Sequence, residues 1–360
     1  MAPSVLVAGA GPVGLAAANR LTRNGATVRI VDSNAARTTL SKALAVNVRT
    51  MELLERSGLT ERLIAAGQRL NRMRFFSGAK PLADIHFDRL DHRYNFLISL
   101  PQSETERILE EDLLALGVGV DRRTGLTAFS AGDDVVDATL RSEDGSETRV
   151  RVDYLIGADG AHSMVRKGLG VGFPGEKHPL HWNLADVEID GPYGADEVTM
   201  HLQPEHAMLV IPLGGRRFRI VTTVPDSLSK LPMGKIVGTP SWSADFSTGH
   251  RIVDSYGSSR VFLAGDAAHI HSPAGGRGMN LGIEDATVLA DRISDGGLTS
   301  YSRDRRRVGL SIVQQTERML SMATLKNPMA RGLRNMLLRQ VVPLDAVQRI
   351  LRPRLMGIAD

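Results

Sequence analysis

RVFLAGDAAHIHSPAGGRGMNLGIEDA, residues 260–286, is the stretch that decides the fold. It begins with a short apolar run that ends in Gly265 and Asp266, which predicts a buried strand with a carboxylate at its carboxyl end. Residues 273–278 contain three glycines, and from Met279 the apolar residues return at helical spacing. The segment therefore predicts a strand, a glycine loop and a helix. Free N–H groups at the helix start would suit an electron-rich ligand lying on the loop.

A related stretch opens the chain. Residues 9–14 read GAGPVG and separate an apolar strand pattern from a helical pattern. Gly9 would permit the turn, Gly11 would let the backbone approach a diphosphate, and Gly14 would let the helix pack on the strand. The next strand ends at Asp32, which can bind a ribose hydroxyl. The pattern predicts dinucleotide binding but does not distinguish FAD from NAD.

Two further segments have similar chemistry. YLIGADGAHSMVRKGLG, residues 154–170, predicts another buried strand that ends in Asp159 and Gly160 before a helix. In LPQSETERILEED, residues 100–112, Ser103 is the expected N-cap of a helix, and Glu106 would complete a capping box.

The remaining chain predicts a second lobe and terminal helices. Strand patterns recur between residues 184 and 223, and with a hairpin at 73–87 they predict a sheet of about six strands that walls a dry pocket. Short strands between 118 and 152 predict an antiparallel meander, and one helix is expected to span Leu53 to Ile64. Two helices are expected over residues 301–325 and 329–341, with their methionines in the core or lining a pocket: Met319, Met322, Met329 and Met336.

Composition bounds the class of protein. The chain has 360 residues, 42% of them hydrophobic and 23% charged, which predicts two lobes of a globular protein. The absence of cysteine excludes disulfides, thiolate metal sites and cysteine nucleophiles. No apolar run approaches the roughly 20 residues that span a bilayer, so we expect a cytoplasmic protein without stable membrane insertion.

Charge says less about partners. Residues 303–354 contain twelve basic and three acidic residues, a bias that could favour anionic cofactors or an acidic partner. Nucleic acid is not an expected partner, because aromatic residues make up only 4% and no recognition motif accompanies the charge. We expect this basic amphipathic region to pack on the second lobe rather than contact a membrane surface.

Histidines are candidates for acid–base chemistry. His201 and His206 could remove a proton from a phenol, since histidine titrates near neutrality, and His178 and His181 are further possibilities. Each is more often structural than catalytic. Asp266, His269 and His271 could suggest a metal, but a closed site needs three or four convergent ligands, and we expect no metal.

Together these segments resemble the group A flavoprotein monooxygenases, the FAD hydroxylases similar to p-hydroxybenzoate hydroxylase. GFPGEKHPLHWNLADVEI, residues 172–189, resembles the aromatic polyketide and phenolic hydroxylase branch. The resemblance implies an α/β fold with a Rossmann-like FAD-binding lobe of the GR2 type, a mostly antiparallel β-sheet substrate lobe and C-terminal helices. It implies a discontinuous FAD-binding domain (1–70, 98–175 and 250–300), a substrate-binding domain (71–97 and 176–249) and helices over 301–360.

The resemblance also implies an activity. NADH or NADPH would reduce FAD, O₂ would be captured as a flavin hydroperoxide, and one oxygen would pass to an aromatic or polyketide-like substrate. The nicotinamide would dock transiently, since no second G-x-G-x-x-G domain is visible. The alternatives of epoxidation, Baeyer–Villiger oxidation, reduction and non-catalytic flavin binding stay open. The protein is expected to be a monomer or a homodimer. The absence of a W-x-W-x-I-P string argues against a halogenase.

Finally, the resemblance implies a set of FAD-site residues. Asp266 would hold the ribityl chain, Arg49 would approach the diphosphate, and amides at 278–280 would meet the isoalloxazine. The full set is Gly9, Gly11, Pro12, Val13, Gly14, Asp32, Ser33, Lys42, Arg49, Gln102, Asp159, Gly160, Gly265, Asp266, Pro273, Gly276, Gly278, Met279 and Asn280. The chain departs from the family in short segments near 224–241 and 294–298 and in Arg277, which would place a cation beside the flavin loop.

Overall fold

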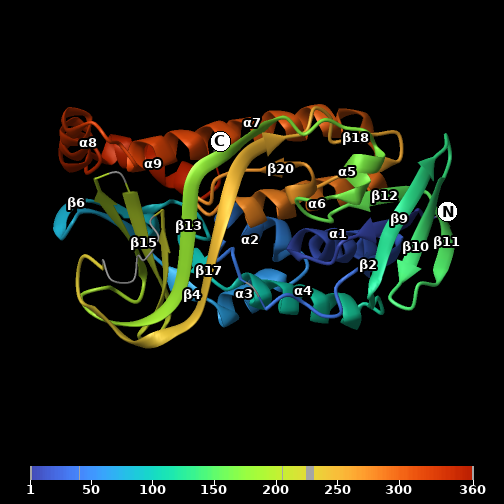
Figure 1. Cartoon of the computed structure of the whole chain (residues 1–360), viewed down its shortest axis with the longest axis horizontal. Coiled ribbons are helices and arrows are strands. Elements are labelled where there is room, and N and C mark those ends of the chain that lie inside the picture. Colours follow the sequence, from blue (N-terminus) through green and yellow to red (C-terminus); the bar gives the residue numbers. More distant parts are fainter. Residues whose placement is uncertain (1, 40, 205, 224–230, 359–360) are drawn as a thin grey trace.

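The computed structural model describes residues 2–39, 41–204, 206–223 and 231–358. Its first sheet has six strands in the order β18-β19-β12-β1-β2-β8, parallel from β19 to β8 (Figure 1). The strands are β18 Gly257–Ser258, β19 Val261–Leu263, β12 Tyr154–Gly157, β1 Ser4–Ala8, β2 Thr27–Asp32 and β8 Val120–Arg122. Since parallel strands end at the same edge, the segments after β2, β1, β12 and β19 meet there.

Helices cover this first sheet. α1 (Pro12–Arg23) begins with proline at its first turn and buries Leu15, Ala18 and Leu21. It packs beside α4 (Gln102–Ala115), where the Asn19 side chain donates to a backbone carbonyl at 2.9 Å, and beside α6 (Gly278–Asp295). α4 begins at Gln102 without a side-chain cap, so the expected Ser103 capping box is wrong.

Two small sheets flank the first lobe. β9 (Thr124–Ala131), β10 (Val136–Ser142) and β11 (Glu147–Val152) form the predicted antiparallel meander. Val120 was expected in this meander, but β8 pairs with β2 instead, because strand periodicity does not identify the partner. The other small sheet contains β3 Ala45–Val46, β7 Leu97–Ser99 and β4 Gln68–Leu70.

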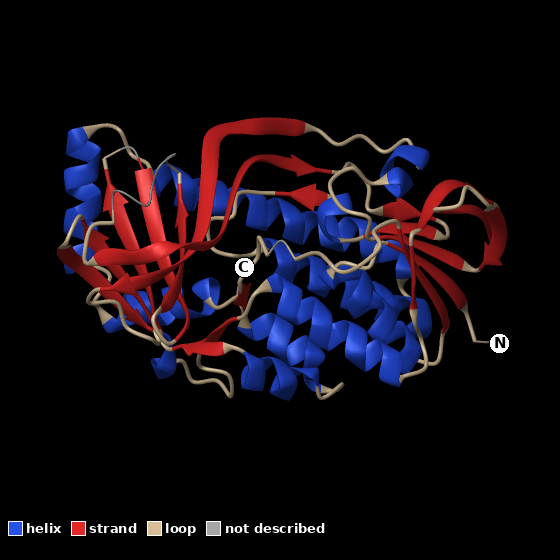
Figure 2. Cartoon of the chain, turned by 60° about the horizontal axis from the view of Figure 1, so that its bottom comes forward, coloured by secondary structure: helices blue, strands red, loops and turns tan. Residues whose placement is uncertain are grey.

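The second lobe is built on eight strands rather than six, in the order β20-β17-β13-β16-β15-β14-β5-β6. They are β20 His269–Ile270, β17 Lys235–Ile252, β13 Gly175–Asp190, β16 Arg217–Thr222, β15 His206–Gly214, β14 Glu197–Gln203, β5 Arg72–Ser77 and β6 Lys80–His86. Figure 2 shows strands of this sheet in red at the end of the molecule opposite the N-terminus. The sheet is antiparallel except for the β14–β5 pair. Sequence analysis missed β17 because most of its side chains are exposed or half-buried, which removes the apolar alternation.

β13 and β17 form a long two-stranded ribbon. They contain 16 and 18 residues, and they pair from Gly175 opposite Arg251 to Asp190 opposite Lys235. Figure 1 shows this ribbon running from the first lobe into the eight-stranded sheet.

The helical predictions need two corrections. The helix expected from Leu53 to Ile64 is two helices, α2 (Val48–Glu55) and α3 (Leu59–Ala66), because Gly58 between them has a φ of +71°. The remaining helices are α5 Met164–Gly168, α7 Leu298–Ala323, α8 Pro328–Gln340 and α9 Asp345–Leu355. α9 lies within the helical region expected over 301–360, although its bounds were not predicted, and the methionines expected in the core are exposed at Met322, Met329 and Met336. Among the described residues, no helix is long and apolar enough to cross a membrane.

Candidate functional site

Residues 9–14 contact the segment after β12, which contains Asp159 and Gly160, through backbone atoms. A Cβ at Gly9 would lie 2.3 Å from the Ala158 carbonyl oxygen, and Gly9 has a φ of +100°. A Cβ at Gly14 would lie 1.9 Å from the Gly9 carbonyl oxygen. No side chain fits at either position. The close approach of α1, β1 and β12 therefore depends on these two glycines.

The segment that contains Gly265 and Asp266 contacts the start of α1 through Val13. A Cβ at Gly265 would lie 2.8 Å from a Val13 methyl, and one at Gly282 of α6 would lie 2.6 Å from the same methyl. The Val13 side chain thus packs against two glycines from the later part of the chain. All three motifs lie at one edge of the first sheet.

Gly11 differs from Gly9, Gly14 and Gly265 in its surroundings. A Cβ there would meet nothing within 4 Å, and the first turn of α1 has neither a side-chain cap nor an acidic residue. Asp32 faces the same turn and accepts hydrogen bonds from Ala10 N at 2.7 Å and Asn34 N at 2.8 Å, while Ser33 is exposed. Open space beside uncapped N–H groups suits an anionic group.

Asp159 is largely committed to the protein itself. One carboxylate oxygen accepts from Met164 N at 2.7 Å and Val165 N at 3.2 Å, at the start of α5. The other oxygen is buried without a hydrogen-bond partner among the described residues. Gly160 has a φ of +76° and open space at its Cβ position.

Asp266 has the opposite character. Its side chain is exposed, and no described residue forms a hydrogen bond with its carboxylate. Loss of bulk water nevertheless raises its pKa, although His269 and Lys42 act in the other direction. An exposed carboxylate without a hydrogen-bond partner among these residues remains available to a ligand. Lys42 lies close by, its amino group 5.7 Å from the Phe246 ring centroid.

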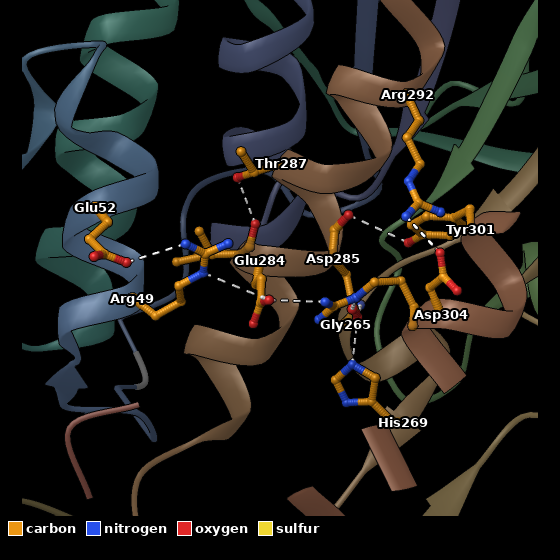
Figure 3. Close-up of polar contacts among 12 residues, drawn as sticks. Arg49, Glu52, Gly265, His269, Glu284, Asp285, Thr287, Arg292, Tyr301 and Asp304 are labelled. Atoms are coloured by element: carbon orange, nitrogen blue, oxygen red, sulfur yellow. Dashed lines mark hydrogen bonds and ion pairs between the residues drawn. The ribbon is translucent and has the colours of Figure 1, made fainter. Parts of the chain in front are cut away.

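A buried ionic network holds the turn that presents Asp266. Asp285 of α6 accepts from Gly265 N at 3.1 Å and contacts His269 Nε2 at 2.6 Å (Figure 3). Arg305 of α7 donates to Asp285 at 2.6 Å and to Glu284 at 3.0 Å. Burial alone would raise the pKa of Asp285, but Arg305 and His269 hold it below its usual value.

Arg49 belongs to the outer end of this network. Its guanidinium lies 3.2 Å from Glu52 and 3.9 Å from Glu284, as Figure 3 shows. The Glu52 contact lies within α2, and the Glu284 contact connects α2 to α6. The described contacts of Arg49 are therefore those of a link between helices.

The glycine loop is fixed by polar contacts. The Asn280 amide donates to Ala45 O and Gly276 O at 2.8 Å each, and its oxygen accepts from Asn47 N and the Thr50 hydroxyl. Met279 is buried, Pro273 and Gly278 are half-buried, and the first turn of α6 has no side-chain cap. Arg277 was expected beside the flavin loop, but its guanidinium donates to Arg354 O at the end of α9.

Gln102 contacts the segment 41–43, which also forms a hydrogen bond with the second lobe. Its backbone N–H donates to the Ser41 hydroxyl at 2.7 Å, and its side chain accepts from Ala43 N at 3.3 Å. Arg219 of β16 donates to Ser41 O and forms two bonds to Asp186 at 2.6 and 2.8 Å. Sequence analysis missed Arg219, whose signal is a charged residue inside the apolar run FRIVT.

An apolar wall faces the glycine loop. One buried cluster joins strand residues Trp182, Leu184 and Val221 to Ala274 of the loop and Leu320 of α7. Half-buried side chains that pack against it include Leu209, Ile211, Trp242 and Phe246. The eight-stranded sheet therefore presents a largely dry surface to residues 273–276.

The candidate histidine bases lie outside this arrangement. His201 is fully buried, with one ring nitrogen 2.8 Å from Gly78 O and the other 3.1 Å from the Tyr193 hydroxyl. His206 contacts Pro204 O at 2.9 Å. His181 contacts Ser247, and the His178 side chain lies outside the described residues. Within the described chain, no group of three or more histidines and carboxylates could hold a metal.

The buried side chain of His271 should make the stability of the protein depend on pH. Burial and the neighbouring His269 lower its pKa from 6.5 to about 4, so protonation favours the unfolded chain. Stability from this group is complete above pH 6.5 and is lost as pH falls toward 4, by about 2 kcal/mol between pH 7 and pH 5. Urea unfolding at both pH values should show a smaller difference for His271→Gln. The exposed control His162→Gln should retain the wild-type difference, and equal behaviour of the two variants would contradict the assignment.

Glycine turns and carboxylates at four neighbouring strand ends define an α/β dinucleotide-binding protein. The chain belongs to the FAD binding domain family, whose model matches residues 3–232 and 225–316. It is 34% identical to 6-methylpretetramide 4-monooxygenase of Streptomyces rimosus, over 91% of this chain and 63% of that protein. It is 31% identical to rifampicin monooxygenase of Streptomyces venezuelae, over 99% of this chain and 78% of that protein.

Solved structures agree with the fold. Anhydrotetracycline hydroxylase of Streptomyces rimosus superposes with a TM-score of 0.80 at 29% identity, covering 100% of this chain and 77% of that one. p-Nitrophenol 4-monooxygenase of Pseudomonas putida gives a TM-score of 0.90 at 22% identity and covers 99% and 98%. The chain therefore has the predicted FAD-binding lobe and substrate lobe.

Proposed function

We propose that the protein is an FAD-dependent monooxygenase that uses NADH or NADPH and O₂ to hydroxylate an aromatic or polyketide-like substrate. The observation that carries the proposal is the placement of Asp266, an exposed carboxyl that follows Gly265, the glycine packed against Val13 at the start of α1. The curated relatives include monooxygenases of a pretetramide, of rifampicin and of pentachlorophenol. A cytoplasmic monomer or homodimer stays a prediction.

The residues of the site fit FAD. The open position at Gly11 and the uncapped start of α1 would accept the diphosphate, and Asp32 and Asp266 offer carboxylate oxygens to hydroxyl groups. The uncapped start of α6 would favour negative charge on the isoalloxazine. Bound FAD would supply the redox chemistry, accepting hydride from the nicotinamide and reacting with O₂.

The chain's own contribution is orientation and exclusion of water. The half-buried side chains at the margin of the apolar wall would contact an aromatic substrate in a region of low polarity: Leu209, Ile211, Trp242 and Phe246. Arg219 fixes the loop containing Ser41 from the substrate side, so substrate contacts and cofactor contacts share one support. The described residues offer no histidine with a free ring nitrogen in this wall, so we assign no general base.

The enzyme assay should separate a hydroxylase from a non-catalytic flavin protein. Protein reconstituted with FAD is mixed with NADH or NADPH and a panel of phenols and polycyclic phenols, and product is compared with nicotinamide consumed. We expect faster nicotinamide oxidation and a hydroxylated product with at least one compound, counting peroxide as uncoupling. A yellow protein that shows neither would contradict hydroxylation, and a colourless protein would contradict FAD binding.

Asp266→Asn should weaken FAD without unfolding the protein. Loss of a charged acceptor for a ribityl hydroxyl should raise the FAD dissociation constant about 10-fold to 100-fold. The apoprotein should not lose stability, because the raised pKa of Asp266 means that folding disfavours its charge. Flavin fluorescence titration and thermal unfolding measure the two effects, with exposed Asp295→Asn as the matched control. Unchanged affinity would remove Asp266 from the site.

A further inference from the structure

Helix α8 has its apolar face turned toward solvent. Met329, Leu333, Met336 and Leu337 follow helical spacing on one face and are 85%, 55%, 46% and 41% exposed. We call these four residues the α8 stripe. The only buried side chain of the helix is an arginine, Arg334. This is the reverse of an ordinary surface helix, whose apolar face packs on the core.

Specific contacts fix this orientation. Arg334 donates to the carbonyl oxygens of Met322 and Ala323 at 2.9 and 3.2 Å, at the C-terminal end of α7. On the same side, the Asn335 amide donates to the Ser77 hydroxyl of β5 at 3.3 Å. A rotation that buried the α8 stripe would break these bonds. The outward stripe is therefore part of the folded arrangement.

The segment that contains the stripe is positively charged. Residues 328–358 contain six arginines and a single acidic residue, Asp345. Arg339 follows Met336 by three positions and is exposed, as are Arg349 and Arg354 on α9. Within the described ranges, no carboxylate forms an ion pair with these three arginines. A second copy of the same face would bring like charges together, whereas an anionic surface would complement them.

We propose that α8 docks the protein on an anionic phospholipid surface. The helix lies at one end of the long axis (Figures 1 and 2), so it can approach a flat surface without a concave partner. Met and Leu side chains would enter the boundary between headgroups and acyl chains while the arginines contact phosphate groups. No helix of the described chain spans a bilayer, so the contact is peripheral. The proposal is independent of the monooxygenase function.

Vesicle co-sedimentation of the whole chain tests it. We expect binding to phosphatidylcholine vesicles that contain phosphatidylglycerol and little binding to phosphatidylcholine alone, with affinity falling as salt rises. Arg339→Gln should lower the affinity about fivefold. The double substitution Leu333→Glu with Met336→Glu should lower it at least about tenfold. The matched control is Leu114→Glu, at a 66% exposed position on α4, which should bind like wild type.

Three outcomes would overturn the proposal. These are no binding to anionic vesicles, equal loss in the Leu114→Glu control, or equal binding to neutral vesicles. Light scattering without lipid tests the alternative that a second copy of the chain covers the stripe. A dimer that Leu333→Glu with Met336→Glu abolishes would assign the α8 stripe to self-association and would also overturn the proposal. Circular dichroism and the visible spectrum of bound FAD show that each variant is folded, since α8 lies outside the proposed cofactor site.

Discussion

Gly14→Ala should destabilise the protein severely, whereas Gly11→Ala should leave it folded but unable to retain FAD. At Gly14 a Cβ would lie 1.9 Å from the Gly9 carbonyl oxygen, so either α1 or the end of β1 must move. The obstacle is backbone rather than a flexible side chain. We therefore expect a loss of about 3 kcal/mol or more in the free energy of unfolding.

Gly11 lies three residues earlier and has the opposite surroundings. A methyl group there meets no protein atom within 4 Å and occupies the space assigned to the diphosphate. The FAD dissociation constant should rise roughly 100-fold while apoprotein stability stays within about 0.5 kcal/mol of wild type. Urea unfolding and flavin fluorescence measure the two quantities. The control is Gly119→Ala, also at an open position, which should change neither.

The contrast makes the assignment testable. If Gly11→Ala binds FAD like wild type, the diphosphate does not lie at the start of α1. If Gly14→Ala retains full stability, the close packing of α1 on β1 is wrong.

Arg305→Met should destabilise the protein by about 3–5 kcal/mol and also weaken FAD binding. Arg305 is the cationic partner of Asp285, a fully buried carboxylate bonded to Gly265 N and His269. Without the guanidinium, the Asp285 carboxylate either stays charged while buried, or takes up a proton and weakens its hydrogen bond from Gly265 N. Either change disturbs the turn that presents Asp266.

Two comparisons isolate the ion pair. Arg303→Met removes an arginine whose side chain is 79% exposed, and it should change stability by no more than about 0.5 kcal/mol. Adding Asp285→Asn to Arg305→Met removes the stranded charge and should recover part of the loss. Chemical denaturation with a parallel FAD titration measures both effects. An Arg305→Met protein as stable as Arg303→Met would show that the network contributes little.

The sequence predicted the cofactor lobe well because its signals are local. Each motif combines an apolar run, a glycine turn and a carboxylate within a few residues, and three such motifs in order leave few alternative folds. The second lobe was harder. The exposed strand β17 lacks apolar alternation, and the split between α2 and α3 depends on the positive φ of Gly58. Neither feature has a strong periodic signal.

The candidate site also contains features that the sequence predicts and features that it does not. Gly9 and Gly14 lie where the fingerprint places them, because close backbone contacts restrict both positions to glycine, whereas the space beside Gly11 is open. The contacts of Arg49 and Arg219 could not be predicted, since a long side chain can reach partners in several directions. Arg219 joins residues 178 positions apart, and that contact depends on how the two lobes pack.

The ribbon of β13 and β17 limits how this molecule can open. Backbone pairing between these strands bridges the lobes over most of their length, with two register shifts, so a wide hinge rotation would break many hydrogen bonds at once. Entry and exit of ligands must then rely on small local displacements at the seam, such as the segment around Ser41. In such an architecture we expect loop movements, rather than rotation of one lobe against the other, to control access to the site.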